Sequence, residues 1–560
     1  MTLLERFLIG IGLWFGGLNF SVLFLGRTKS LTEANLIAVL LFSLVLVAPA
    51  ALKWLSDLKK SWPKKFKANL VISLLLFVIF LHVVLQLIGA LAPEIKFDAL
   101  WYHLTEAKTY LQEGQIRTFY PPAQLSQSSV TPRLQDLLYV FTLAFWPTEQ
   151  LAKLLNFVFG ALSLLGVYAV GRRFGNSLVG LLAALIFASF PIFGWLAQTA
   201  YIDLSVAFYF SLAALVFFAG VPASTLTSFA LLGLFLSTKI WALIILPVVF
   251  GYQLYQTRSF DRAIAPLAGA LLIASPWFFE ALITTGNPVF PIFSLNQPEL
   301  LGGYASAPEW LIRGWPTQFW PNFKRFFIHD FALLALVPGL LVGGLIRIKL
   351  RSILGLIVVS AATYFLFSFI SNPDPRFLLP FLVVAVVLLS KLWFEQGILL
   401  KIVAAVAMIA IIFANFLPLY FRTAKTFPVV FAKQSRQDYL EAELGKNVHS
   451  FIDVDNQVAN QLKPGDRLVT LVHNMFYIEF PHRDGFDLKI ELAETGSPQE
   501  LLTKLKNLGF SHILVKTREY KLKDLFALGN FSQLSQDEYE QIVPIVWSSK
   551  ETNTALYKIP

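Results

Sequence analysis

Long uninterrupted runs of apolar residues constrain this chain more than any other feature. Residues 36–51, 71–91 and 402–417 reach or approach the roughly 20 apolar residues that a helix needs to cross a bilayer. Only 14% of the 560 residues are charged and 56% are hydrophobic, against roughly 25% charged in an ordinary soluble domain. One water-soluble core could not bury this excess, so the sequence predicts an α-helical polytopic membrane protein.

The hydropathy pattern predicts thirteen membrane-spanning helices. We expect the first, 3–25, to be a retained helix, because it is long, aromatic and followed by no small-residue cleavage site. The other twelve are 33–53, 68–92, 151–171, 176–197, 201–220, 224–237, 240–256, 262–284, 331–347, 351–371, 376–394 and 398–421.

The distribution of Lys and Arg predicts the orientation. With a cytoplasmic N-terminus, thirteen of these cations fall in inside loops and only four, Arg27, Lys29, Lys239 and Arg376, in the short outside loops. This count requires that residues 133–146, between two prolines, form a helix lying at the outer interface, because they are too few to cross. If they instead form a short tilted span, everything after them is inverted.

Two long outer loops, 93–150 and 285–330, are therefore predicted. Loops of this length are usually functional. After about residue 422 the charged residues, Gly and Asn reach frequencies typical of a soluble protein, which predicts a small extracytoplasmic α/β domain of about 130 residues. Within it we expect strands at 467–472 and 512–516 and amphipathic helices at 446–462 and 498–508, with Gly465 and Gly509 where helices end.

The composition also excludes some classes of protein. The chain has no cysteine, which rules out a disulfide-linked secreted domain. Its net charge of +10 lies in short loops between spans, which does not favour a nucleic-acid partner. The sequence contains no Walker loop, GxGxxG or CxxC motif, and its histidines show no paired metal-ligand spacing.

The start of the first outer loop, residues 97–110, is the most informative segment for chemistry. At helical spacing one face carries Asp98, Trp101, Tyr102, Thr105 and Glu106, while the opposite face is apolar. A carboxylate just beyond a span can act as a general base or metal ligand, with aromatic rings beside it that stack on a sugar. The alternative is that Asp98 caps the helix that follows it.

Three more charged residues fall on the same side. Asp203, at the outer end of a span, is either functional or another helix cap. Lys239 and Arg376 are unusual cations for an outer face, and each is a candidate for an anionic lipid phosphate or a snorkelling side chain. Asn287 belongs to the turn cluster at 285–291, for which a plain loop is a sufficient explanation.

Together these segments resemble a known family. Asp-Ala-Leu-Trp-Tyr-His-Leu at 98–104, Tyr-Ile-Asp-Leu at 201–204, Gly-Asn-Pro-Val-Phe-Pro at 286–291 and Arg-Phe-Leu-Leu-Pro at 376–380 are similar to bacterial GT-C membrane glycosyltransferases. The nearest branch would hold the lipid A aminoarabinose transferases and protein O-mannosyltransferases. The resemblance divides the chain into two extra N-terminal helices (1–67), a GT-C-like catalytic domain (68–421) and the extracytoplasmic domain (422–560).

The resemblance implies an inverting transfer of a hexose or pentose from a polyprenyl-phosphate-linked donor to a lipid, glycan or protein acceptor, at the outer face of the plasma membrane. Asp98 and Asp203 would be catalytic. The substrate-binding residues would be Trp101, Tyr102, His103, Glu106, Lys239, Asn287 and Arg376. Many relatives carry an acidic pair where this chain has Asp98-Ala99, so the cofactor is unknown and a divalent metal ion is left open. The alternatives are a transporter or flippase of lipid-linked sugars, and an envelope assembly scaffold.

Overall fold

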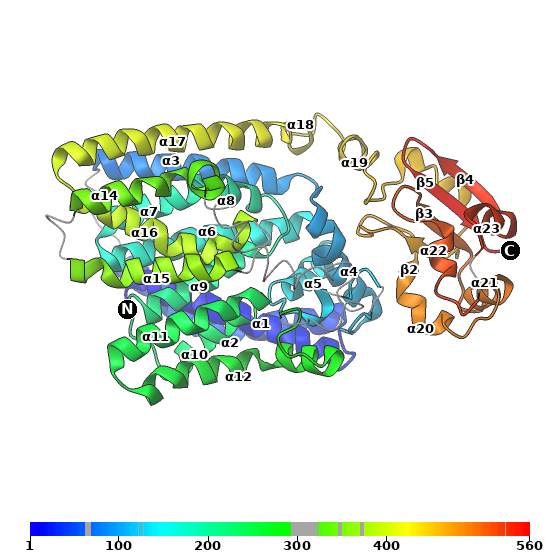
Figure 1. Ribbon diagram of the computed structural model, residues 1–560, viewed down its shortest axis with the longest axis horizontal. Helices are drawn as coiled ribbons and strands as arrows, with labels where there is room; N and C mark the ends of the chain where they lie inside the picture. The colour runs from blue at the N-terminus through cyan, green and yellow to red at the C-terminus, as the bar shows by residue number, and fades with distance from the viewer. Residues whose placement is uncertain are drawn as a thin grey trace.

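The computed structural model describes residues 1–61, 69–120, 123–126, 128–292, 321, 324–344, 350–369, 374–531 and 534–560. It shows a long helix bundle with a small domain at one end (Figure 1). In the described part of the chain, eight helical segments are long and apolar enough to cross a membrane. They are α1 (Leu3–Arg27), α2 (Glu33–Ser61), α3 (Leu70–Leu91), α6 (Gln150–Phe174), η3 with α11 (Ile240–Thr257), α12 (Phe260–Thr285), η8 with α16 (Pro375–Glu395) and α17 (Ile398–Ala424).

The remaining predicted spans are also helices. Pro191 divides the predicted span 176–197 in two, because proline cannot donate the backbone hydrogen bond that would continue the first helix. The resulting helices and the others of this group are α7 (Ser177–Ser189), α8 (Pro191–Leu196), α9 (Asp203–Phe217), α10 (Thr225–Leu236), η7 (Ala332–Ala335), α14 (Leu336–Gly344) and α15 (Leu350–Phe369). The α-helical polytopic fold predicted from hydropathy is thus confirmed.

Short polar residues set several helix ends. Thr2 and Glu5 form a capping box at the start of α1, and the side chain of Asn69 accepts backbone hydrogen bonds at the start of α3. Asn176 does the same for α7. Gly286, with φ of 71°, ends α12 in the left-handed conformation that glycine adopts without strain.

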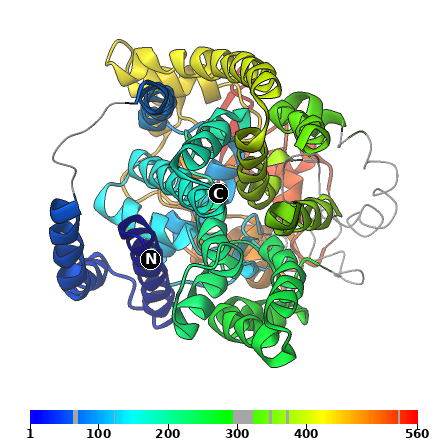
Figure 2. The ribbon, with the colours of Figure 1, turned by 90° about the vertical axis from the view of Figure 1, so that its left-hand side faces the viewer.

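The centre of the bundle is formed by α6, α7, α9 and α16, which pack against one another. The backbones of α6 and α7 come close at Gly171 and Gly180. A Cβ added to Gly171 would lie 2.9 Å from the Gly180 Cα. Helix α1 joins this core, and Tyr209 of α9 donates a hydrogen bond to the Gly12 carbonyl. Helix α2 lies at the periphery of the bundle, and only 6% of its most apolar stretch is buried inside the protein (Figure 2).

The described residues of the predicted outer loop 93–150 contain helices and helical turns. These are the π-helical turn η1 (Ala99–His103), α4 (Leu104–Glu113), the short 3-10 turn η2 (Ser128–Val130) and α5 (Asp136–Phe145). Ten residues make α5 about 15 Å long, too short to cross. Residues 136–143 are all buried between α1, α4 and α6, so this helix packs against the bundle, and its position at the outer interface stays a prediction. Most of the predicted loop 285–330 lies outside the described residues.

The C-terminal domain contains a five-stranded sheet with strand order β2-β1-β3-β5-β4. Strands β1 (Leu468–Leu471), β2 (His482–Asp484) and β3 (His512–Lys516) are parallel, and β4 (Ile545–Ser549) and β5 (Thr554–Lys558) add antiparallel pairs. Alternate residues of β1 and β3 enter two apolar clusters on opposite faces, which is why both strands are fully buried. Helices α20 (Lys489–Leu492), α21 (Pro498–Asn507), α22 (Leu522–Phe526) and α23 (Gln536–Ile542) cover one face.

The two predicted strands and the helix at 498–508 are confirmed, but the helix predicted at 446–462 is wrong. That segment forms two 3-10 turns, Val454–Asn456 and Ala459–Gln461. The Asp453 carboxylate accepts hydrogen bonds from the backbone N–H of Val458 and Ala459, at 2.8 and 2.9 Å. These local side-chain bonds compete with a helix for the same donors.

The bundle and the C-terminal domain are joined through α17, α18 (Phe427–Val430) and α19 (Arg436–Leu444). The domain also contacts the first loop directly. Arg117 forms a bidentate ion pair with Asp487, and the backbone N–H of Gln124 donates a hydrogen bond to the Asp484 carboxylate. The ordered first loop therefore lies between the bundle and the domain (Figure 1).

Candidate active site

Five charged residues from four separate segments meet at the end of the bundle that carries the C-terminal domain. Asp98 precedes η1, Asp203 begins α9 and Lys239 precedes η3. Asp374 precedes η8, and Arg376 lies within it. An Nη1 of Arg376 lies 2.6 Å from an Asp98 oxygen, and Lys239 Nζ lies 2.6 Å from an Asp203 oxygen. We call this group the charged cluster. It brings together Asp98, Asp203, Lys239 and Arg376, which the loop positions placed on one side.

Within the charged cluster, Arg376 is the common partner. Its Nε lies 2.9 Å from the Asp374 carboxylate, and its guanidinium lies 5.2 Å from the ring centre of Tyr201. Asp203 is also within its electrostatic reach. The side chains of Asp98, Lys239 and Arg376 are each about 15% exposed, so these charges are largely shielded from water yet still reachable. Low exposure strengthens each charge interaction relative to one on an open surface.

Asp98 does not cap the helix that follows it. Its carboxylate makes no capping hydrogen bond, and instead pairs with Arg376 and accepts a 3.4 Å hydrogen bond from the Tyr102 hydroxyl. Its backbone N–H donates to the Tyr201 hydroxyl at 3.1 Å. The structure therefore contradicts the capping alternative and places Tyr102 beside Asp98, as helical spacing predicts.

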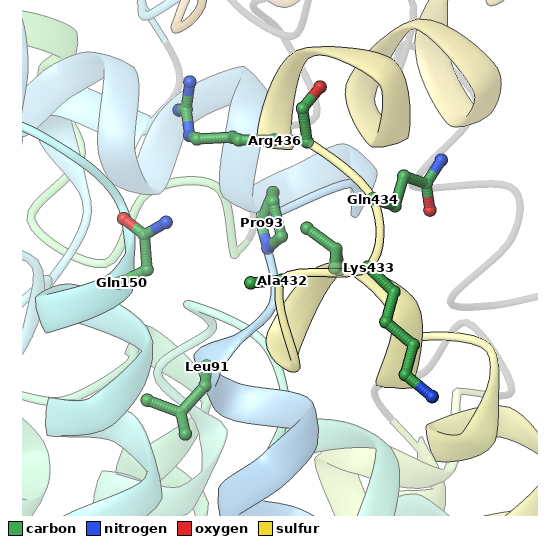
Figure 3. Close-up of a pocket in the computed structure, with 9 residues that line it drawn as sticks. Leu91, Pro93, Gln150, Ala432, Lys433, Gln434 and Arg436 are labelled. Carbon is green, nitrogen blue, oxygen red and sulfur yellow. The ribbon is translucent and has the colours of Figure 1, made fainter.

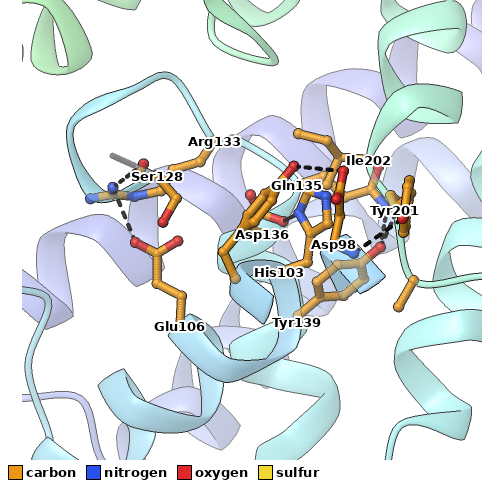
Figure 4. A network of polar contacts seen from close by, with 12 residues as sticks. Asp98, His103, Glu106, Ser128, Arg133, Gln135, Asp136, Tyr139, Tyr201 and Ile202 are labelled. Atoms are coloured by element: carbon orange, nitrogen blue, oxygen red, sulfur yellow. Dashed lines mark hydrogen bonds and ion pairs between the residues drawn. The ribbon is translucent and has the colours of Figure 1, made fainter. Parts of the chain in front are cut away.

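Behind Asp98 lies a buried histidine–aspartate pair. His103 Nδ1 is 2.6 Å from an Asp136 oxygen, and the His103 side chain has no exposed surface. Figure 4 shows this pair between Asp98 and Tyr201 on one side and Glu106 on the other. His103 thus positions the rings of Tyr102 and Tyr201, at 4.1 and 5.4 Å, rather than facing open solvent.

Glu106 is not in the charged cluster. It is buried against Arg133 at 3.2 Å and accepts a hydrogen bond from Tyr110, and burial raises its pKa to about 7 although Arg133 opposes this shift. The predicted open acidic face is therefore wrong for Glu106 and Thr105, both of which are buried. The physical reasons are the wider π turn at 99–103, which changes the register of the face, and the enclosure of α4 by its neighbours.

Trp101 and Asn287 form hydrogen bonds to other parts of the chain. The Trp101 indole N–H donates to the Gln124 carbonyl, and its ring packs 4.7 Å from that of His473 in the C-terminal domain. Asn287 bonds its own turn, donating to the Ile292 carbonyl and accepting from the Val289 N–H. Both residues stabilise local structure in the arrangement seen here.

Sequence reasoning missed the residues that fix the turn before Asp203. Glu94 accepts hydrogen bonds from the Thr199 hydroxyl and the Ala200 N–H, and Asn156 donates to the Leu196 and Thr199 carbonyls. The Tyr139 hydroxyl donates to the Tyr201 carbonyl. A buried Glu and Asn beside spans were the available signal, because such groups are retained in a membrane only with partners.

The acids of the charged cluster do not form a metal-ligand set. Asp98 and Asp203 each face a cation at 2.6 Å. Among the described residues no group of three or more His, Cys, Asp or Glu side chains could hold a metal ion.

The chain is thus a polytopic helical membrane protein with a C-terminal sheet domain at one end, and its structural neighbours have the GT-C fold. A scan against protein-family models and a search of curated proteins give no match. A comparison with solved structures does give matches.

In particular, the chain has the fold of ArnT from Cupriavidus metallidurans. The form bound to undecaprenyl phosphate matches with a TM-score of 0.54 and 14% identity over 87% of this chain and 98% of ArnT. The apo form matches with a TM-score of 0.54 and 15% identity over 88% and 99%. An oligosaccharyltransferase from Archaeoglobus fulgidus has a TM-score of 0.45 at 13% identity, over 81% of this chain and 70% of that one.

Proposed function

We propose that this protein is a membrane glycosyltransferase that moves a sugar from a polyprenyl-phosphate-linked donor to an acceptor on the extracytoplasmic side. One observation supports this most directly: two cations and three carboxylates from four separate segments converge in the charged cluster. The likeness to ArnT, which was crystallised with undecaprenyl phosphate, supports the class of donor.

The charges have complementary tasks in such a reaction. Arg376 and Lys239 would bind the donor phosphate and stabilise the negative charge that grows on it as the bond to the anomeric carbon breaks. Asp98 would accept the proton from the attacking hydroxyl or amine as the new bond to that carbon forms. Direct attack opposite the leaving phosphate would invert the anomeric configuration.

The present ion pairs fit this scheme. Lys239 pairs with Asp203 and Arg376 pairs with Asp98, each at 2.6 Å, so both cations are paired with a carboxylate before any donor binds. A phosphate entering between them would take over contacts with Arg376 and Lys239, and Asp98 would lose its strongest cationic partner. A carboxylate released in this way is a better base, because a neighbouring cation stabilises its charged form.

The test is donor cleavage. Purified protein in vesicles, given a labelled polyprenyl-phosphate sugar and candidate acceptors, should release polyprenyl phosphate in step with glycosylated product, and NMR of the product should show inversion. Movement of intact donor across the bilayer without cleavage would instead support the flippase.

A further inference from the structure

A second polar site lies at the same end of the bundle, away from the charged cluster. A pocket of about 460 Å³ opens where the ends of α3 and α6 meet the segment 429–436 that leads into the C-terminal domain (Figure 3). Its polar lining residues are Gln150, Lys433, Gln434, Ser435 and Arg436, and Leu91 and Pro93 are among its apolar ones. Figure 3 shows the Arg436 side chain extending towards the side of the pocket that holds Gln150.

An adjoining pocket of about 560 Å³ shares Gln150 and Arg436 with the first. Its wall is mostly apolar and comes from the end of α5 and the first turns of α6, through Phe145, Trp146, Leu151 and Leu154. Trp146 is 58% exposed and Leu91, at the rim of the first pocket, is 41% exposed. An exposed Trp at the end of a membrane bundle marks the boundary between headgroups and acyl chains.

The charges at this boundary favour an anion. Arg436 pairs with the buried Glu149 at 2.9 Å, which neutralises one cation. The Glu479 carboxylate also acts on Arg436. Lys433 is exposed and has no ion pair among the residues that the structure describes, and Figure 3 shows its side chain extending away from Gln150, so its ammonium is available to an anion at the edge of the first pocket. Its flexible stem can swing the ammonium over the pocket mouth.

From this amphipathic arrangement we propose that the two pockets bind an anionic phospholipid of the adjacent leaflet. The phosphate would lie against Lys433, Arg436 and Gln150, and an acyl chain would lie along Leu151 and Leu154. This site is additional to the proposed donor site and does not depend on it.

A lipid bound at this site would contact residues that are linked to the charged cluster by a continuous series of ion pairs and hydrogen bonds. Arg436 holds Glu149, and Glu149 accepts a hydrogen bond from the Glu94 N–H at 3.4 Å. The Glu94 carboxylate in turn holds the turn at Thr199 and Ala200, next to Tyr201. The lipid would therefore stabilise the segment that begins at Pro93 and leads to Asp98.

The experiment uses the full chain in nanodiscs of phosphatidylcholine with or without phosphatidylglycerol. Native mass spectrometry should show that the wild type retains phosphatidylglycerol preferentially. Lys433→Gln should lower this retention about fivefold, the equivalent of about 1 kcal/mol for one cation near an anionic lipid. Leu154→Phe, which fills the apolar pocket without adding polarity, should lower it as well.

Lys425→Gln is the matched control, because Lys425 is an exposed cation on the same connection that lines neither pocket. It should retain lipid like the wild type. Equal retention by wild type, Lys433→Gln and Leu154→Phe would refute the proposal. Displacement of the lipid by millimolar inorganic phosphate would also refute it, because it would identify a site for soluble anions.

Discussion

Replacing Asp98 with Asn separates a catalytic role from a purely structural one. The change removes the negative charge and basicity but keeps an oxygen that accepts the hydrogen bond from Arg376, now 2.6 Å away. Arg376 also keeps its pair with Asp374 at 2.9 Å. We therefore expect only about 1–2 kcal/mol of lost stability, in the range of one hydrogen bond to a charged group.

The expected effect on catalysis is much larger. A positioned general base contributes roughly 10²–10⁴ in rate, or about 3–5 kcal/mol of transition-state stabilisation. Single-turnover transfer from a polyprenyl-phosphate sugar in vesicles should fall by this factor, while donor binding stays close to that of the wild type. Measuring both quantities is necessary, because a loss confined to binding would assign Asp98 to holding Arg376.

Asp374→Asn is the matched control for this variant. It removes a different carboxylate partner of the same guanidinium, on a side chain that is 30% exposed. Transfer should therefore stay within a few-fold of the wild type. A near-normal rate for Asp98→Asn, or an equal loss in both variants, would refute the assignment of Asp98 as the base.

Four further predictions concern other parts of the chain. Lys239→Ala should raise the KM for the donor more than it lowers kcat, because a phosphate contact acts in the ground state as well as during transfer; a pure kcat effect would contradict this role. A reporter fused after residue 422 should be active only outside the cytoplasm and one at Ser177 only inside, and the same side for both would invalidate the topology. The fragment 430–560 should be soluble and inactive, since the domain has two apolar clusters of its own; turnover by this fragment would move the site out of the bundle. Because burial raises the pKa of Glu106 from 4.5 to about 7, the folded state holds a proton that the unfolded state has released between these values, so Tm should fall as pH rises from about 5 to 7 and level off above, and Glu106→Gln should flatten that slope.

Hydropathy and charge placement were sufficient for the bundle and for the four paired charges. Apolar runs predicted thirteen spans, and eight helical segments of the described chain are long and apolar enough to cross a membrane. Residues at alternate span ends share a side, which is how Asp98, Asp203, Lys239 and Arg376 could be grouped before their contacts were known. Their pairing could not be predicted, because it depends on which helix ends are neighbours. Hydropathy carries no information on that.

The buried polar pairs were also beyond sequence reasoning. Asp136 lies 33 residues from His103, and Arg133 lies 27 residues from Glu106, so neither partnership has a local period to reveal it. The π turn at 99–103 adds a second difficulty, since an ideal helical wheel assigns Glu106 to the wrong surroundings. In the C-terminal domain, strand β4 is half exposed and lacks the apolar run that identified β1 and β3.

The contacts between the first loop and the C-terminal domain constrain how such proteins can be recombined. Gln124 and Asp484 are 360 residues apart in the chain, yet one donates directly to the other, and Arg117 and Asp487 are matched in the same way. A domain transplanted from a related chain would meet a loop shaped for another partner, and that loop also carries Asp98. The two segments therefore have to be inherited, or exchanged in a chimera, as one unit.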